Sequence, residues 1–302
     1  VKNYKEWSKL FPKNKAILYF ASEGKKGELP AYLSKGFLKS GFFVFRNSWG
    51  EDATQMVVKA GPKAFWHCQP DNGTFEMWFN GKNLFPDSGS YVYAGSKEVN
   101  EERNWFRQTA VHNTLTLNNK NLDQTNSKTL LWQPEGDIQT LVTENPSYKD
   151  LTHRRSIFFV NNTYFVIVDE AIGAAKGFVN LHYQMPKGKI ANSREDMTFV
   201  TKFESGSNMN LQCFGPDGMS MKKEEGWAST AYRKKFKRMN VSFNVKKEND
   251  AVRYITIIYP MKDSADAPAM SAKFKTKKFD GKNLKVEVKV GGKKQSLKYT
   301  LQ

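Results

Sequence analysis

Acid–base chemistry in this sequence would most simply come from its histidines, which are His67, His112, His153 and His182. Imidazole titrates near neutral pH and can both accept and donate a proton, although a histidine among strands is often only a hydrogen-bonded structural residue. His67 begins the run His-Cys-Gln-Pro-Asp-Asn-Gly-Thr-Phe, in which Pro70 and Gly73 interrupt a strand pattern over 65–69. We therefore expect His67 to lie at a strand end, as the candidate catalytic residue.

The neighbours of His67 are polar. Alternate residues of a strand share a face, so Gln69 is expected to project beside His67. Asp71 and Asn72 could extend this polar cluster, but turn formation, in which their side chains satisfy backbone groups, is the favoured interpretation for these two.

A second polar set lies further along the chain. Asn80-Gly81 is a strong signal for a two-residue hairpin, which would return the chain and bring Asp87 toward Gln69. With the imidazole of His112, these residues would make a mixed nitrogen and oxygen site for a metal ion. Their spacing is not a standard zinc signature, so the pattern predicts a site without naming its metal.

Trp105 and Arg107 could contact an anionic sugar. A guanidinium pairs with sulfate or carboxylate, and an indole stacks on the face of a sugar ring. The alternative is a surface strand in which Trp105 is an anchor.

The charge balance favours an anionic partner. The chain has 302 residues, with 47 Lys and Arg against 30 Asp and Glu, a net charge of +17. Nucleic acid, anionic lipid and sulfated or uronic-acid polysaccharide all fit. The lysine-rich runs at 222–223, 234–238 and 293–294 could equally be solvated decoration. No nucleic-acid-binding module is recognisable, so we expect no nucleic-acid partner.

The remaining composition excludes a membrane span, because no apolar run approaches about 20 residues. Cys68 and Cys213 lack metal-type spacing and could form a disulfide or stay as two thiols. The first residues contain neither an initiator Met nor the apolar core of a signal peptide, which suggests a processed or excised chain.

The elements that would position these residues are mostly strands. Short helices are expected at 4–11 and 14–23, the second ending at Gly24, and no long helix is expected after residue 40. Short strands with Gly, Asn and Asp turns then recur along the chain. The expected strands are 42–46, 54–59, 65–69, 74–79, 82–86, 91–93, 111–118, 128–133, 137–143, 154–160, 163–169, 177–184, 197–203, 209–214, 228–232, 238–245, 251–260, 271–278, 283–290 and 294–301.

This pattern predicts an all-β protein, a large antiparallel sandwich of two sheets. The expected organisation is a helical segment and linker at 1–40, a main β-sandwich domain at 41–260, and a carboxy-terminal β-meander at 261–302 that packs on the sandwich or is part of it.

Several segments together resemble one enzyme family. They are Phe45-Arg46 with Trp49, Gly61-Pro62, the run from Trp66 to Phe75, Asp87-Ser88-Gly89, Arg107-Gln108-Thr109, His112-Asn113-Thr114, His153-Arg154-Arg155 and Tyr164–Glu170. In this order they resemble the carboxy-terminal part of heparinase II/III-like polysaccharide lyases, most closely those of the heparinase III type that act on heparan sulfate. The likeness covers roughly residues 5 to 260.

The resemblance implies an α/α toroid before the β-sandwich, and the first helices would be the end of that toroid. It implies β-elimination on a uronic-acid glycosaminoglycan such as heparan sulfate, with Asn, His and Tyr residues of the toroid and one sandwich histidine, here His67, at the cleft. Without the toroid the chain is expected to be inactive. A glycan-binding or scaffold module without chemistry is the alternative.

The resemblance also implies a structural metal and a location. Relatives hold the metal with a His, Asp, His set, matched here by Gln69, Asp87 and His112. The replacement of a histidine by Gln69 leaves calcium, zinc or an empty polar network open. A periplasmic or secreted bacterial protein is expected.

Overall fold

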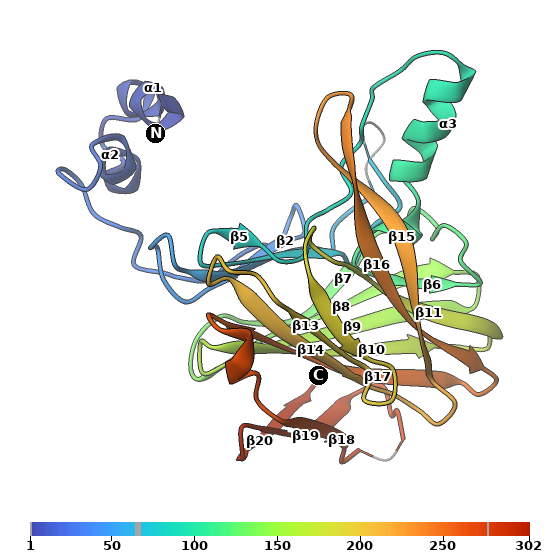
Figure 1. The fold of residues 1–302 in the computed structure, drawn as a ribbon. Helices are drawn as coiled ribbons and strands as arrows, with labels where there is room; N and C mark the ends of the chain where they lie inside the picture. The colour runs from blue at the N-terminus through green and yellow to red at the C-terminus, as the bar shows by residue number, and fades with distance from the viewer. Residues whose placement is uncertain (1, 64–67, 277) are drawn as a thin grey trace.

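A computed structural model describes residues 2–63, 68–276 and 278–302. These residues form four antiparallel sheets stacked in layers, with two helices projecting at the amino-terminal end (Figure 1). The predicted all-β class with a short helical segment at the start is therefore confirmed.

The central layer is an eight-stranded sheet. Its middle strands carry continuous apolar runs such as Phe165-Val166-Ile167-Val168, all buried, because both of their faces are covered. In spatial order the strands are β12 (Ile190–Ser193), β13 (Thr198–Thr201), β14 (Asn208–Phe214), β17 (Ala251–Met261), β10 (Tyr164–Ile172), β9 (Leu151–Val160), β8 (Ile138–Tyr148) and β7 (Lys128–Gln133).

Two smaller sheets cover one face of the central sheet. The five-stranded sheet contains β1 (Lys35–Phe37), β2 (Phe42–Arg46), β3 (Thr54–Lys59), β4 (Phe75–Phe79) and β5 (Lys82–Asn83). The four-stranded sheet has the order β15 (Ser220–Ala231), β16 (Lys234–Lys247), β11 (Gly177–Gln184) and β6 (Leu115–Leu117). Their inward side chains share one core with the central sheet, in which Phe45 packs against Phe159 and Phe165.

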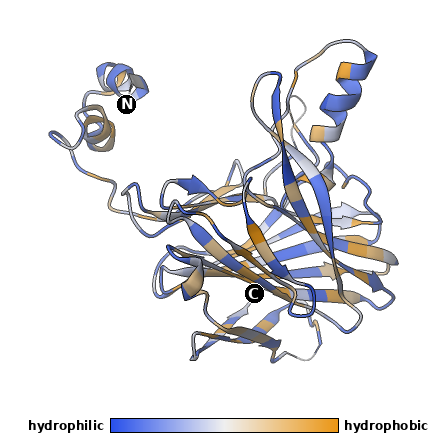
Figure 2. Cartoon of the chain, viewed as in Figure 1, coloured by the Kyte–Doolittle hydropathy of each residue, from blue (hydrophilic) through white to orange (hydrophobic). Residues whose placement is uncertain are grey.

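A three-stranded sheet covers the opposite face. It consists of β18 (Met270–Phe274), β19 (Asn283–Val290) and β20 (Lys293–Thr300). Alternate residues of β19, from Leu284 to Val290, are buried in a second core against the central sheet, while the residues between them face solvent. Figure 2 shows hydrophobic residues concentrated on the inner strands and hydrophilic residues over the β15–β16 hairpin.

Helices lie at the periphery. They are α1 (Lys2–Leu10), α2 (Lys15–Ala21), α3 (Lys97–Phe106) and the single turns η1 (Thr109–Val111) and η2 (Ser264–Asp266). Asn14 caps α2 by accepting a hydrogen bond from the backbone of Ile17 at 3.1 Å. Within the described parts of the chain, no helix is long and apolar enough to cross a membrane.

The ten-residue helix α3 corrects the expectation that no long helix follows residue 40 and that Trp105 lies on a surface strand. The segment is rich in Lys, Glu and Arg, which are good helix formers, and its apolar residues do not alternate.

The predicted Asn-containing turns are confirmed. Asn80 and Gly81 both have positive φ, 48° and 75°, as a type I′ turn between β4 and β5 requires. Asn161 and Asn162, with φ of 49° and 53°, connect β9 to β10.

Other strand predictions were wrong. Cys68 and Gln69 lie in no strand, because Pro70 lacks the N–H that a continuing ladder of hydrogen bonds needs. The strand predicted at 91–93 is absent as well, and these residues are irregular.

Candidate functional site

The predicted catalytic residue, His67, lies outside the described residues, as do Ala64, Phe65 and Trp66. The described residues on either side are fixed by hydrogen bonds. The backbone N–H of Lys63 donates to Asn126 Oδ1 at 2.7 Å, and the carbonyl of Cys68 accepts from Arg107 Nη2 at 2.7 Å. Both ends of the interval that contains His67 are therefore attached to other parts of the fold.

The segment after Cys68 is held from several sides. Thr109 Oγ1 donates to the carbonyl of Pro70 at 2.6 Å. The buried side chain of Asn72 bonds both backbone groups of Gly61 at 3.2 Å and donates to the carbonyl of Thr125 at 3.0 Å. Asn72 thus satisfies backbone groups, as the turn interpretation predicts.

Asp71 differs from that interpretation. Its Oδ1 pairs with Lys59 Nζ at 2.5 Å, a cation on β3. The pair ties the segment to the five-stranded sheet.

A buried ionic network lies beneath this segment. Asp169 on β10 accepts from Arg155 Nε at 2.7 Å and bonds His153 Nε2 at 2.6 Å. Arg155 Nη1 also donates to the carbonyls of Gly73, at 2.5 Å, and Asn113, at 2.6 Å. Arg155 thereby connects the central sheet to two loop segments, one at Gly73 and the other at Asn113.

The protonation states of this network follow from its geometry. Burial alone would raise the pKa of Asp169, but Arg155 and His153 outweigh it and hold that pKa below its usual value. Burial lowers the pKa of His153 despite its carboxylate partner. Asp169 is thus an anion, balanced by the guanidinium of Arg155.

Sequence reasoning assigned no functional part to Arg155 and Asp169. The signal exists only once the strand register is known, because they are cross-strand partners in β9 and β10.

Asp87 and His112 are brought together, as predicted. Asp87 Oδ2 lies 2.6 Å from His112 Nδ1, and Asp87 Oδ1 accepts from the backbone N–H of Gly89 at 2.7 Å. Burial lowers the pKa of the His112 imidazole, but the charge of Asp87 outweighs this and raises it above the ordinary value. The raised pKa favours the charged imidazole, so buried His112 forms an ion pair with the partly exposed Asp87.

Arg238 on β16 holds the segment that carries Asp87. It donates to the carbonyl of Pro86, and its Nη2 donates to Ser88 Oγ at 2.6 Å. Sequence reasoning missed Arg238, which stands inside a lysine-rich run that looks like surface decoration.

Two members of the expected metal set, Asp87 and His112, contact each other directly. Two ligands of one tetrahedral ion with bonds of about 2.1 Å lie roughly 3.4 Å apart. At 2.6 Å, Asp87 and His112 are instead hydrogen-bonded to each other. Gln69 Oε1 and His112 Nε2 are buried and have no hydrogen-bond partner among the described residues. The same residues contain no group of three or more His, Cys, Asp or Glu placed to hold a metal. The calcium or zinc ion stays a prediction.

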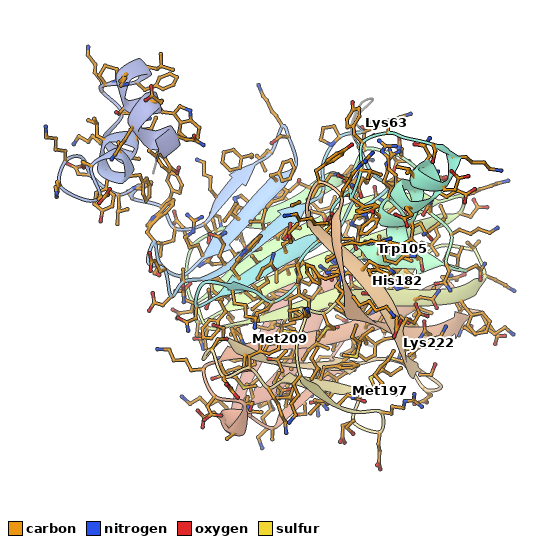
Figure 3. The ribbon with its side chains drawn as sticks, turned by 45° about the horizontal axis from the view of Figure 1, so that its top comes forward. Lys63, Trp105, His182, Met197, Met209 and Lys222 are labelled. Atoms are coloured by element: carbon orange, nitrogen blue, oxygen red, sulfur yellow. The ribbon has the colours of Figure 1, made fainter. Side chains whose placement is uncertain are left out.

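Trp105 and Arg107 lie at the end of α3, beside the segment that follows Cys68. They line a surface hollow of about 720 Å³ together with Pro70. Its other polar side chains are amides and one carboxylate, from Glu101, Asn104, Gln108, Asn121 and Gln124. Pro70 and Gln124 also line an adjoining hollow with Lys59 and Lys63, and Figure 3 shows Lys63 and Trp105 on the α3 side of the molecule.

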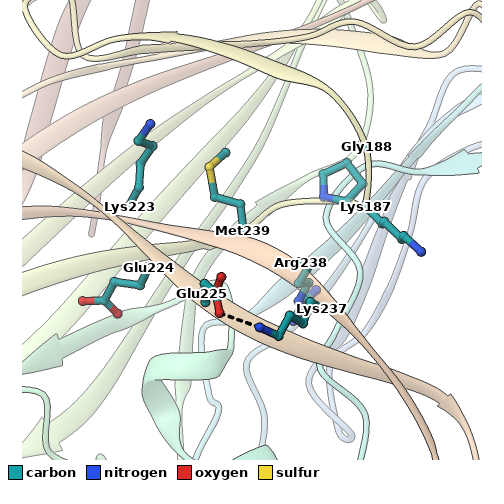
Figure 4. Close-up of a pocket in the computed structure, with 9 residues that line it drawn as sticks. Lys187, Gly188, Lys223, Glu224, Glu225, Lys237, Arg238 and Met239 are labelled. Atoms are coloured by element: carbon teal, nitrogen blue, oxygen red, sulfur yellow. Dashed lines mark hydrogen bonds and ion pairs between the residues drawn. The ribbon is translucent and has the colours of Figure 1, made fainter.

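A separate hollow of about 580 Å³ lies against the β15–β16 hairpin (Figure 4). Its lysines and glutamates include the pair Lys237 and Glu225, joined at 3.0 Å. It contains none of the site residues predicted from the sequence.

His182 has a structural position. Its side chain is buried on β11, and its Nε2 lies 2.8 Å from Thr116 Oγ1 on β6. Burial lowers its pKa from 6.5 to about 4. The imidazole is therefore neutral in the folded protein at pH 5, where an unfolded chain would carry it protonated.

This sets a pH dependence of stability. Between pH 6.5 and about 4 the unfolded chain binds a proton that the folded chain does not, so acidification favours unfolding. We expect the free energy of unfolding of the His182→Gln variant to fall less steeply than that of the wild type, by up to about 1.4 kcal/mol per pH unit. Urea denaturation across this pH range measures the difference, and parallel curves would contradict it.

Comparisons with known proteins agree with this fold. The family model "Heparinase II/III-like, C-terminal" matches residues 30–273. A "Heparin-sulfate lyase" from Bacteroides stercoris is 78% identical over 302 residues, and one from Pedobacter heparinus is 38% identical over 296 residues. They are matched by 100% and 97% of this chain, which covers 45% of each relative. The chain thus spans about half the length of the curated relatives it matches.

Solved structures give the same result. A heparinase III gene product superposes with a TM-score of 0.98 at 78% identity, over 99% of this chain and 47% of that protein. A crystal structure of a heparan sulfate lyase from Pedobacter heparinus has a TM-score of 0.94 at 36% identity, over 100% and 48%. The chain belongs to the heparinase II/III-like family, and it carries the carboxy-terminal domain of that family.

Proposed function

We propose that this chain is the carboxy-terminal domain of a lyase that cleaves heparan sulfate, or a related uronic-acid glycosaminoglycan, by β-elimination. The observation that carries the proposal is the 78% identity, across the whole chain, to a relative named heparin-sulfate lyase. Because that relative is more than twice as long, the proposed activity needs a further amino-terminal part, which we propose to be an α/α toroid carrying Asn, His and Tyr catalytic residues.

The proposed reaction removes the proton at C5 of the uronate and expels the oxygen linked at C4. Neutralising the uronate carboxyl is essential, because negative charge develops beside it as the proton leaves. We assign His67 as the base or as the partner on the carboxyl side, depending on the uronate epimer. The hydrogen bonds on Lys63 and Cys68 support this, since they attach both sides of that position to the fold.

In this proposal the hollow at the end of α3 is part of the cleft wall. Trp105 offers an aromatic face to a sugar ring, and the surrounding amides offer donors and acceptors to its hydroxyls. We further propose that the protein acts in the periplasm or outside the cell, where it would meet its polysaccharide substrate.

The proposal is tested with a chimera that joins this chain to the remaining part of the Bacteroides stercoris relative. We expect the chimera to depolymerise heparan sulfate and to leave a C4–C5 double bond on the new end, detected by ultraviolet absorbance. Products without the double bond would show hydrolysis, and an inactive but folded chimera would favour a glycan-binding module.

Arg107 offers a sharper test of the site. Its side chain donates a hydrogen bond to the carbonyl of Cys68, so we expect Arg107 to position the neighbouring residues more than to pair with sulfate. Replacing it with Met in the chimera should lower kcat roughly tenfold with little change in KM, because a charged hydrogen bond of about 1.5–3 kcal/mol is lost.

The matched control for Arg107→Met is Arg103→Met. Arg103 lies on the same helix and contributes the same charge, but its guanidinium lies over the Tyr93 ring. An increase in KM alone for Arg107→Met would instead support direct substrate binding by Arg107.

A further inference from the structure

The outer face of the three-stranded sheet is strongly basic. Strand alternation puts six exposed lysines on the side turned away from the second core. This lysine face consists of Lys273 and Lys275 from β18 and the residue after it, Lys285 and Lys289 from β19, and Lys294 and Lys298 from β20. It contains a single carboxylate, Glu287, which leaves a net charge of +5.

Strand register puts like charges opposite each other on this face. Lys285 pairs with Lys298, and Lys289 pairs with Lys294, across β19 and β20. Directly opposed like charges destabilise an antiparallel pair, and neighbouring strands are only about 4.8 Å apart. The sequence therefore holds two unfavourable pairs on one small sheet.

Glu287 offsets this repulsion only in part. It lies among three lysines, at 2.8 Å from Lys294, 3.3 Å from Lys273 and 3.4 Å from Lys275. Lys285, Lys289 and Lys298 form no ion pair with a carboxylate of the described residues. Glu287 thus pairs with three of the six lysines, and the other three are exposed cations outside these ion pairs.

We propose that the lysine face is an accessory binding site for a linear sulfated or carboxylated polysaccharide. The ligand class rests on the proposed function, whereas the anionic character of the ligand rests on the charges of the face. An extended polyanion lying across β19 and β20 would place negative groups between the opposed lysines and relieve their repulsion.

The side chains of the face favour a polysaccharide over nucleic acid. Proteins that hold single-stranded nucleic acid combine cations with aromatic side chains on which bases stack. The outward residues of the described strands here are lysines with Glu287, Ser271, Asn283, Ser296 and Thr300, and none is aromatic. Lysine ammonium groups on flexible stems suit sulfates and carboxylates at irregular positions.

The lysine face is remote from the proposed cleft wall. The three-stranded sheet lies on one side of the central sheet, and the five- and four-stranded sheets lie on the other (Figure 1). A long glycan could therefore be held by the lysine face without occupying the hollow beside α3. The expected consequence is retention of the enzyme on long chains, with no effect on short ones.

The test compares two triple variants of the 302-residue chain that remove equal charge. The face variant is Lys285→Gln, Lys289→Gln and Lys298→Gln, and the control is Lys128→Gln, Lys149→Gln and Lys202→Gln, three exposed lysines elsewhere. Heparan sulfate binding is titrated at several salt concentrations. We expect the slope of log affinity against log salt to fall by about 2 in the face variant, from three lost contacts at about 0.7 each, and to change little in the control.

Equal weakening of heparan sulfate binding in both variants would overturn the proposal, because binding would then depend only on the net charge of the protein. An equal loss of single-stranded DNA binding in the face variant would overturn the polysaccharide assignment. The melting temperature of the face variant should not decrease, since two repulsive pairs are removed.

The same substitutions in the chimera separate this proposal from the proposed function. Turnover of a tetrasaccharide should be unchanged and turnover of long chains reduced. An inactive chimera whose lysine face still binds heparan sulfate would refute the lyase assignment alone.

Discussion

Replacing His67 with alanine in the chimera is expected to lower kcat on heparan sulfate at least about 100-fold, because a positioned general base or acid contributes about 10²–10⁴. The effect should fall on kcat more than on KM, since proton transfer occurs only in the transition state. Steady-state release of unsaturated product measures both constants.

Two controls make the His67 result specific. One limb of the pH profile of kcat/KM should disappear in His67→Ala, and added imidazole should restore part of the turnover. The variant's melting temperature should match that of the wild type. Unchanged turnover would remove His67 from the catalytic set and leave the domain as a glycan-binding wall.

The second large effect concerns stability. Arg155→Met would leave Asp169 buried without its guanidinium and the carbonyls of Gly73 and Asn113 without a donor. Removing one partner of a buried ion pair costs about 3–5 kcal/mol. We expect a loss of this size in the free energy of unfolding, measured by urea denaturation.

Arg154→Met is the matched control, because Arg154 directly precedes Arg155 on β9 and pairs at 2.5 Å with Glu144, which is more exposed than Asp169. The free energy of unfolding should fall clearly less in Arg154→Met than in Arg155→Met. Arg155→Lys retains a charge but not the forked geometry of the guanidinium, so its loss of unfolding free energy should lie between those of the two Met variants. Equal losses for Arg154→Met and Arg155→Met would contradict the assignment of Arg155 as the main connector.

Much of the fold follows from local sequence patterns. The hairpin at Asn80-Gly81 requires two residues of positive φ, and Asn and Gly adopt that conformation readily. Strand β7 was predicted with its observed bounds, and so was β19. Helix α3 was missed because its ten residues give no amphipathic stripe that distinguishes them from a polar loop.

The candidate site is harder to predict from the sequence than the fold. Asp87 and His112 were predicted to meet, and they do, although as an ion pair. Gln69 was expected on a strand, but Pro70 ends the ladder there. Arg155, Asp169 and Arg238 were missed because a buried charge is identified by its partners, and those partners are far away in sequence.

The order of the central sheet has a consequence for the growing chain. Strand β17 lies between β14 and β10, so β10 receives one of its two neighbours only when residues 251–261 have been synthesised. Until then an apolar strand offers an unpaired edge, which can recruit strands from other molecules. Correct assembly therefore depends on shielding that edge during translation, and we expect a chain interrupted before residue 251 to aggregate rather than to fold in part.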